Sequence, residues 1–275
     1  MAGSTIGTYQ HRLPASIIGG FGDRRSGARL RDATVQVTHL ASGRSFLQKA
    51  SRVGGETGAF DFVNRDATAD TLWNDVEQHL QPALDTLVNA RPLAEHATAT
   101  DVELSEPDKA ALSHAADIVR TYAVQTEVRC ALFDEVQRCK GLHRDAIQQL
   151  RHDLAPQLQA QATTGDRDLA ILTPVSSRCP PAIVDEWGYT DLVGAEHGRL
   201  LPVRSDLVLF FRSPETSPPD AAVAWGDLDD FVQDVRRAMT RPAPHGSPPR
   251  RFVFARPDDA LTDVLPRYQP PRPRR

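Results

Sequence analysis

Cysteines are few and long apolar segments are absent in this 275-residue chain, and each of these features excludes a class of protein. The three cysteines include no CxxC pair, which argues against a disulfide framework and against a cysteine-rich zinc site. No apolar run approaches the roughly 18 residues that span a bilayer, and the first residues lack the basic start and apolar stretch of a signal peptide. We therefore expect reduced thiols in a cytoplasmic protein that has no membrane-embedded segment.

Lysine is also scarce, because arginine carries almost all of the basic charge. This bias is typical of codon usage in a GC-rich genome and indicates no particular chemistry. The net charge of −4 and the pI near 6.1 disfavour binding to nucleic acid or to an anionic membrane. The arginines near the C-terminus could still contact phosphates, although a solubilising tail is the simpler interpretation. The sequence leaves the oligomeric state open.

The order of the hydrophobic patterns predicts an α+β fold in which strands and helices are segregated along the chain. An N-terminal β-hairpin is followed by a central helical block with one long helix, and then by C-terminal strands with one helix. Pro82 lies inside the first helical pattern, where its missing N–H should kink or split the helix. The expected strands are residues 34–38, 45–48, 59–62, 169–172, 207–211 and 251–254, and the expected helices are residues 67–89, 105–139, 143–161 and 227–239.

The chain is long for one domain but does not require two. Residues 1–10 are small and polar, and we interpret them as a flexible arm. Residues 11–260 are expected to form a single α+β domain. Residues 261–275, which become rich in proline and arginine, are expected to form a disordered tail.

The long helix carries polar residues on its apolar side. At 100° per residue, Gln125, Thr126 and Arg129 fall within the stripe that also contains Val119 and Tyr122. An arginine at such a position requires a carboxylate, a backbone carbonyl or an anionic ligand, because a buried unpaired charge is unstable.

Glu77 is the predicted partner of this arginine. It lies within about 40° of the centre of the apolar stripe of the preceding helix, and therefore points inward. We expect Glu77 and Arg129 to approach each other in the interior, with Tyr122 and Gln125 adjoining. Such a pair can simply fix the packing of two helices, or it can belong to a ligand-binding or catalytic pocket, and the sequence leaves both interpretations open.

Motifs for nucleotide phosphates, dinucleotides, catalytic zinc and a nucleophilic serine are all missing, since GxxxxGK[ST], GxGxxG, HExxH and GxSxG do not occur. The nine histidines show no metal-ligand spacing, so we assign no metal site, and any cofactor stays unknown. We single out His11 because it begins a turn-rich segment ahead of Pro14. A histidine hydrogen-bonded within a loop is an equally good interpretation.

These features occur in the order of a known family. The chain resembles the bacterial family called domain of unknown function 4238, which opens with a His-x-x-Pro segment and an apolar stretch ending in Phe, here residues 11–21. Glu77 matches the inward glutamate of that family, and Gln125 and Arg129 match the Gln-x-x-x-Arg of its long helix. The resemblance implies one domain around a helical core, and it brings no established substrate, cofactor or reaction.

The second half of the chain resembles this family less closely. The family often has a Ser-Asp-x-Pro segment, and its nearest match here is residues 177–180, where Arg178 stands in the acidic position. The resemblance therefore implies a weakened or altered site. The family's next strand entry is similar to residues 201–205, and the likeness spans roughly residues 8–260 with short motifs.

Three functions remain open, and whether the protein is an enzyme is one of the open questions. The first is a ligand-binding protein in which Tyr122, Gln125 and Arg129 bind a small anionic or nucleotide-like ligand, with Arg129 as the anion partner. The second is a hydrolase acting on phosphodiesters, with His11 as general acid/base and Glu77 as base or metal ligand. The third is a protein-interaction module without chemistry.

Overall fold

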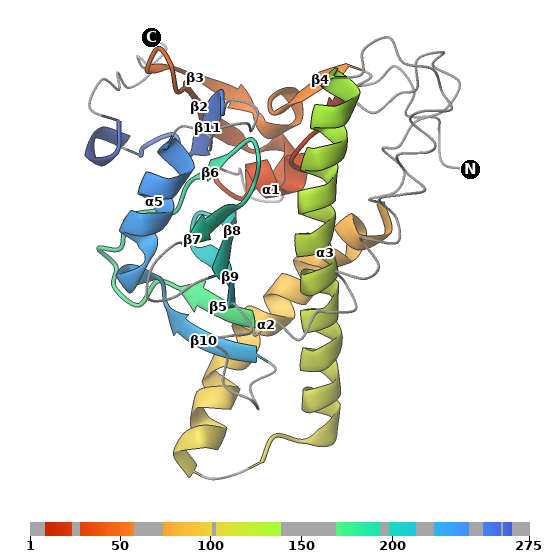
Figure 1. The fold of residues 1–275 in the computed structure, drawn as a ribbon. Coiled ribbons are helices and arrows are strands. Elements are labelled where there is room, and N and C mark those ends of the chain that lie inside the picture. The colour runs from red at the N-terminus through yellow and green to blue at the C-terminus, as the bar shows by residue number, and fades with distance from the viewer. Residues whose placement is uncertain are drawn as a thin grey trace.

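Two larger sheets, one two-stranded sheet and two long helices make up the described part of this computed structural model (Figure 1). The described residues are 9–23, 28–57, 74–100, 103–138, 169–192, 198–212, 223–241, 250–259 and 261–265. The strands are β1 (Tyr9–His11), β2 (Thr34–His39), β3 (Arg44–Lys49), β4 (Gly55–Thr57), β5 (Leu169–Thr173), β6 (Val184–Asp185), β7 (Thr190–Leu192), β8 (Gly198–Arg204), β9 (Leu207–Arg212), β10 (Val223–Asp227) and β11 (Phe252–Ala255). The helices are α1 (Ala15–Gly19), α2 (Asn74–Thr100), α3 (Glu106–Arg138) and α5 (Val232–Thr240), with short 3-10 helices η1 (Leu30–Asp32), η2 (Ala50–Arg52), η4 (Leu228–Asp230) and η5 (Leu261–Asp263).

The observed order of elements confirms the predicted α+β fold class, including the N-terminal hairpin. Strands β2 and β3 pair in antiparallel fashion with Val37 opposite Phe46, and the turn between them ends at Gly43. Gly43 has φ of 64°, a conformation that glycine adopts without the steric cost of a side chain. The predicted strand at 59–62 lies outside the described residues.

The predicted arm is too long at its C-terminal end. Tyr9 and Gln10 belong to β1, which pairs with β4 in antiparallel fashion. The pairing with β4 was not apparent from the sequence, because neither three-residue segment has a strand pattern of its own. Residues 1–8 lie outside the described part of the chain.

The central helical block is confirmed, and its two helices pack against each other (Figure 1). Ser105 caps α3 as expected, because its hydroxyl oxygen accepts the amide hydrogen of Asp108 at 3.4 Å. Helix α2 continues through Pro82 to Thr100, so the expected split does not occur. Leu80 and Leu84 on either side of the proline are buried, and this packing outweighs the lost hydrogen bond. The expected helix at 143–161 lies outside the described residues.

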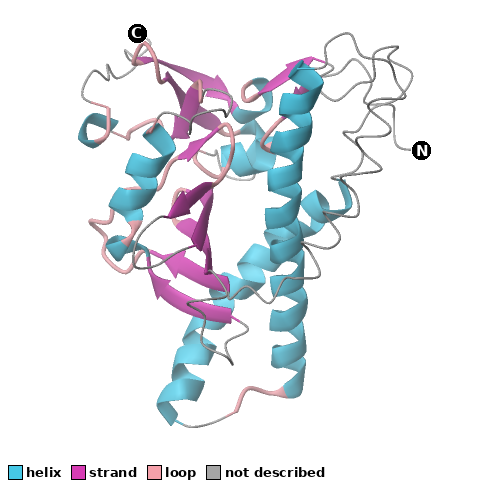
Figure 2. Ribbon diagram, viewed as in Figure 1, coloured by secondary structure: helices cyan, strands magenta, loops and turns pink. Residues whose placement is uncertain are grey.

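The five-stranded sheet has the order β10-β5-β9-β8-β7. Strands β5 and β9 confirm the two predicted apolar strands, β8 overlaps the strand entry that the family resemblance implied at residues 201–205, and β7 and β10 were not predicted as strands. Residues 223–227 form β10, parallel to β5, so the helix expected to start at Asp227 begins instead at Val232. Helices α2 and α3 lie on one side of this sheet and α5 on the other (Figure 2).

The four-stranded sheet has the order β3-β2-β11-β6 and joins the two halves of the chain. Strand β11 confirms the last predicted strand, and it pairs with β2 on one side and with β6 on the other. The buried hydrophobic residues of both sheets and of α2, α3 and α5 form one contiguous cluster. Association of β2 with β11 therefore depends on contacts between segments that lie far apart in the sequence.

The folded part of the chain extends beyond the predicted boundary at residue 260. Leu261 is completely buried and begins η5, and Asp263 in the same turn bonds to a buried arginine. The segment 261–265 is thus part of the packed body, and residues 266–275 lie outside the described part. Among the helices that the structure describes, none combines the length and the apolar character needed to cross a membrane.

Candidate functional site

The predicted pairing of Glu77 with Arg129 is confirmed. Glu77 lies in the first turn of α2, and its Oε1 accepts a hydrogen bond from the Nη1 of Arg129 on α3. The side chain of Arg129 is 6% exposed, whereas that of Glu77 is 25% exposed. The pair therefore spans from the interior to solvent, with the guanidinium inside and the carboxylate at the boundary.

The side of α3 that carries Arg129 is polar but mostly buried. Tyr122 and Thr126 are each 3% exposed, and the Thr126 hydroxyl donates to the Tyr122 carbonyl within the helix at 2.9 Å. Gln125 stands one turn before Arg129 on the same side and is partly exposed. No hydrogen bond or ion pair of Gln125 occurs among the described residues, so its amide is available to a ligand.

His11 ends β1 opposite Gly55 of β4, and its ring packs edge-on against Tyr9 with the ring centres 5.0 Å apart. Burial lowers the pKa of His11 to about 4, and the positive charge of nearby Arg129 adds to this shift. His11 is therefore neutral at pH 7. Its Nε2 atom is buried and makes no hydrogen bond within the part of the chain that the structure describes.

The structure thus brings together three of the predicted residues, from three different elements. Arg129 pairs with Glu77 and acts electrostatically on His11. Gln125 and Tyr122 lie one and two turns before Arg129 on α3. The roles assigned to these residues in catalysis or ligand binding stay predictions.

A turn that sequence analysis missed closes against this region. The Oδ1 atom of Asp185 accepts the amide hydrogens of Trp187 and Gly188, both at 2.9 Å, and Gly188 has φ of 81°. A side chain at Gly188 would meet Leu13 at 2.6 Å and Thr126 at 3.4 Å, so the turn packs closely on α3. An aspartate that bonds to amides two and three residues ahead, followed by glycine, is a recognisable turn signal.

Burial raises the pKa of Asp185 to about 6, although the Arg250 side chain, whose Nε lies 2.7 Å from Oδ2, acts in the opposite direction. The carboxylate has no exposed surface, so it is kept in the interior by this arginine and by the two amides of its turn. This turn therefore holds a buried acid that binds its proton more tightly in the folded chain than in the unfolded chain.

Two further arginines lie on aromatic rings near the same turn. The guanidinium of Arg12, a residue that is 6% exposed, lies 5.5 Å from the centre of the Trp187 ring. Arg199 of β8 pairs with Glu127 of α3, and its guanidinium lies 4.7 Å from the centre of the Tyr189 ring. These contacts hold positive charge close to α3 and reduce the cost of its burial.

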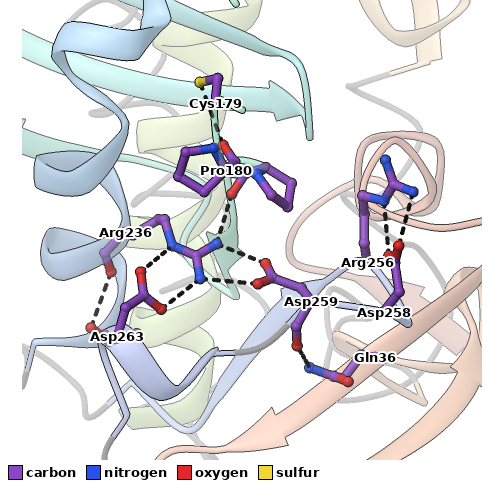
Figure 3. A network of polar contacts seen from close by, with 10 residues as sticks. Gln36, Cys179, Pro180, Arg236, Arg256, Asp258, Asp259 and Asp263 are labelled. Carbon is purple, nitrogen blue, oxygen red and sulfur yellow. Dashed lines mark hydrogen bonds and ion pairs between the residues drawn. The ribbon is translucent and has the colours of Figure 1, made fainter. Parts of the chain in front are cut away.

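A second buried ionic cluster lies where α5 meets the C-terminal segment (Figure 3). Arg236 is 1% exposed and donates to both oxygens of Asp259, to both oxygens of Asp263 and to the Pro181 carbonyl, at 2.7 to 3.0 Å. Burial raises the pKa of Asp259. Burial alone would also raise the pKa of Asp263, but the bonds and charge of Arg236 outweigh it and lower that pKa.

The family resemblance aligns Arg178 with an acidic residue, but this arginine does not bond to the Glu77–Arg129 pair. Arg178 is exposed, its amide donates to the Ser176 hydroxyl at 3.1 Å, and it makes no hydrogen bond or ion pair with Arg129 or Glu77. A carboxylate is nevertheless supplied here by Asp229 of η4, which accepts the amide hydrogen of Ser176 at 3.2 Å. Burial, helped by Asp229, raises the pKa of Cys179 to about 11, so this thiol is unreactive at neutral pH.

Among the residues that the structure describes, no group of three or more His, Cys, Asp or Glu side chains is arranged to hold a metal ion. No family model, curated protein or solved structure matches the chain. The resemblance to the domain of unknown function 4238 therefore stays a prediction. The candidate site rests on the geometry of its own side chains.

Proposed function

We propose that this chain is a cytoplasmic protein that binds a small anionic or nucleotide-like ligand at the cluster of His11, Glu77, Gln125 and Arg129, with Tyr122 beside them. The observation that carries this proposal is the unequal burial of the ion pair. The guanidinium of Arg129 is inside, whereas the carboxylate of Glu77 reaches solvent. An incoming anion can therefore exchange with Glu77 without first exposing the buried cation.

The neighbours of Arg129 support binding of an anion. His11 is neutral at pH 7, so it adds no second positive charge that would require its own counterion, and its Nε2 can bond to a ligand. Gln125 adds a partly exposed amide with both donor and acceptor atoms. The planar guanidinium can bind a carboxylate or a phosphate with two parallel hydrogen bonds.

Native mass spectrometry of the purified full chain tests whether a ligand is retained from the host cell. Titration calorimetry then uses inorganic phosphate, citrate and adenosine monophosphate as probes, with uncharged adenosine as the matched control. We expect at least one anionic probe to bind and adenosine to bind more weakly. If none of the three anions binds, and no retained molecule is detected, the proposal is wrong.

Variants of the ion pair identify the site. Arg129→Gln removes a charged hydrogen bond and should weaken anion binding by roughly ten- to a hundredfold. Glu77→Gln should strengthen it, because the internal competitor for Arg129 loses its charge. Arg237→Gln is the matched control, since Arg237 on α5 is exposed and pairs only loosely with Asp234. Unchanged binding in Arg129→Gln would contradict this assignment.

The proximity of His11, Glu77 and Arg129 also supports a second candidate, a hydrolase acting on phosphodiesters. In it, His11 is the general acid/base, Glu77 is the base or a metal ligand, and Arg129 binds the phosphate. A pKa near 4 makes His11 a weak base at pH 7, so ligand binding is the better supported function. Hydrolysis of bis-p-nitrophenyl phosphate that is lost in His11→Ala would favour the hydrolase, and activity that survives the substitution would remove His11 from the mechanism.

A further inference from the structure

Strand β3 is one of the two edges of the four-stranded sheet as the described residues form it. It pairs with β2 on one side, and no described strand lies on its other side (Figure 1). Phe46 and Leu47, at the centre of β3, are 45% and 43% exposed. Because neighbouring residues of a strand point to opposite faces, both faces of β3 present apolar surface.

The ladder with β2 shows which backbone groups of β3 are available. The amide of Ala50 donates to the Ala33 carbonyl at 3.0 Å, and bonded and non-bonded pairs alternate along an antiparallel ladder. Phe46 and Gln48 therefore bond to β2, whereas Ser45, Leu47 and Lys49 turn their backbone groups outward. The outward amide of Lys49 already donates to the Gln48 side chain at 3.0 Å.

Positive charge flanks these outward groups. Arg44 and Lys49 stand at the two ends of β3, both are exposed, and neither has an ionic partner among the described residues. Two copies of β3 in antiparallel pairing would bring the Arg44 end of one against the Lys49 end of the other. This like-charge contact disfavours a second copy of the chain as the occupant.

We infer that the β3 edge binds an extended peptide of acidic character, which adds a fifth strand to the sheet. Its main chain pairs with the outward groups of Ser45 and Leu47. Apolar side chains at its centre cover Phe46 and Leu47, and acidic residues at its ends meet Arg44 and Lys49. This surface is independent of the ligand site on α3.

The direct test is an NMR titration of the ¹⁵N-labelled full chain with three synthetic peptides. The first has four valine or threonine residues between glutamates, the second replaces the glutamates by lysines, and the third is the first peptide with N-methylated alternate amides. Only the first should shift the β3 resonances and slow amide exchange at Leu47. No shift with the first peptide up to about 1 mM, or equal shifts with all three, would overturn the inference.

Two independent variants separate backbone pairing from charge. Leu47→Pro removes an outward donor without breaking a bond to β2, so it should fold and lose peptide binding. Arg44→Glu combined with Lys49→Glu leaves the backbone unchanged, and should weaken binding of the glutamate peptide roughly three- to tenfold while improving binding of the lysine peptide. If Leu47→Pro does not fold, this double variant alone decides the question, and unchanged selectivity would refute the role of charge.

Lys109→Glu is the matched charge control, because Lys109 lies in the first turn of α3, at the far end of the molecule from β3 (Figure 1). It should leave peptide binding unchanged. Sedimentation of the unlabelled chain over a range of concentrations tests whether a second copy of the chain binds at the β3 edge instead of a peptide. A dimer that Leu47→Pro dissolves would assign the edge to a second copy of this chain, and would overturn the acidic-peptide inference.

Discussion

Arg129 and Arg236 are both almost completely buried, but the described residues bonded to Arg236 include two carboxylates, whereas Arg129 bonds to the carboxylate of Glu77 and lies near the neutral ring of His11. Among the described residues, Arg236 and its two carboxylate partners sum to a charge of −1, which disfavours an added anion. Among the described residues, Arg129 bonds to the single carboxylate of Glu77, and the Nε2 atom of neighbouring His11 makes no described hydrogen bond. The comparison teaches that burial of an arginine does not by itself indicate function, and that the surrounding charges decide between structure and binding.

The largest effect is expected at Arg236. Replacing it by methionine leaves Asp259, whose side chain is 4% exposed, as a buried charge without its partner. We expect Arg236→Met to lower the free energy of unfolding by about 3 to 5 kcal/mol, measured by urea denaturation. Arg237→Met, one residue away but 60% exposed, is the control and should change it by less than about 0.5 kcal/mol. Similar values for the two variants would remove the structural role assigned to this cluster.

The next largest effect is a pH dependence of folding stability, which His11 beside Arg129 is expected to cause. The pKa of His11 is lowered from 6.5 to about 4, so its neutral form stabilises the fold fully above pH 6.5, and this stability is lost as the pH falls toward 4. Between pH 7 and pH 5 the loss should be about 2 kcal/mol. The His11→Gln variant should not show this loss of stability between pH 7 and pH 5.

Asp185 makes the stability of the fold change with pH in the opposite direction, over an overlapping pH range. Its pKa is raised to about 6 by burial, so its contribution is present in full below 3.8 and is lost as the pH rises through 6. The histidine effect is therefore measured as the difference between the parent chain and His11→Gln at each pH. A difference that stays constant from pH 7 to pH 5 would mean that His11 does not titrate as described.

A smaller effect is expected for the Glu77–Arg129 pair, because Glu77 is partly solvated. Arg129→Met should cost about 2 kcal/mol, between the values for exposed and fully buried pairs. In a double-mutant cycle with Glu77→Gln, the combined cost should fall about 1 kcal/mol short of the sum of the single costs. If the single cost matched that of Arg236→Met, the contrast between the two arginines would disappear.

The smallest effect is expected for Gln36, which bonds to the backbone of the Arg236 cluster. Gln36 of β2 is completely buried, and its Nε2 donates to the Asp259 carbonyl at 3.3 Å. Gln36→Leu removes this long hydrogen bond and should cost about 1 kcal/mol or more by urea denaturation. Gln48→Leu on the edge strand is the control, because it loses only an exposed bond from the Lys49 amide. An equal cost for the two variants would show that burial of the Gln36 bond adds nothing to stability.

The same sequence signal accounts for one arginine that was predicted and for one that was missed. Arg129 was found because it lies in the apolar stripe of a helix. Arg236 also lies in such a stripe, since Val232, Val235 and Met239 of α5 are buried on the same side. It was overlooked because its partners, Asp259 and Asp263, stand at and beyond the boundary where a disordered tail was expected.

Local patterns determined the β2–β3 hairpin, the long helix α3 with its Ser105 cap, and the apolar strands β5 and β9, since these depend on neighbours in the sequence. They also indicated that Glu77 and Arg129 turn inward. Only the tertiary structure decided that β10 pairs with β5 and that β11 lies between β2 and β6. It also decided that the His11 ring is buried near Arg129, and burial first and the arginine second lower the pKa of that ring. Pairing of distant strands and the electrostatic environment of a buried ring both depend on what packs beside a residue, which no local pattern contains.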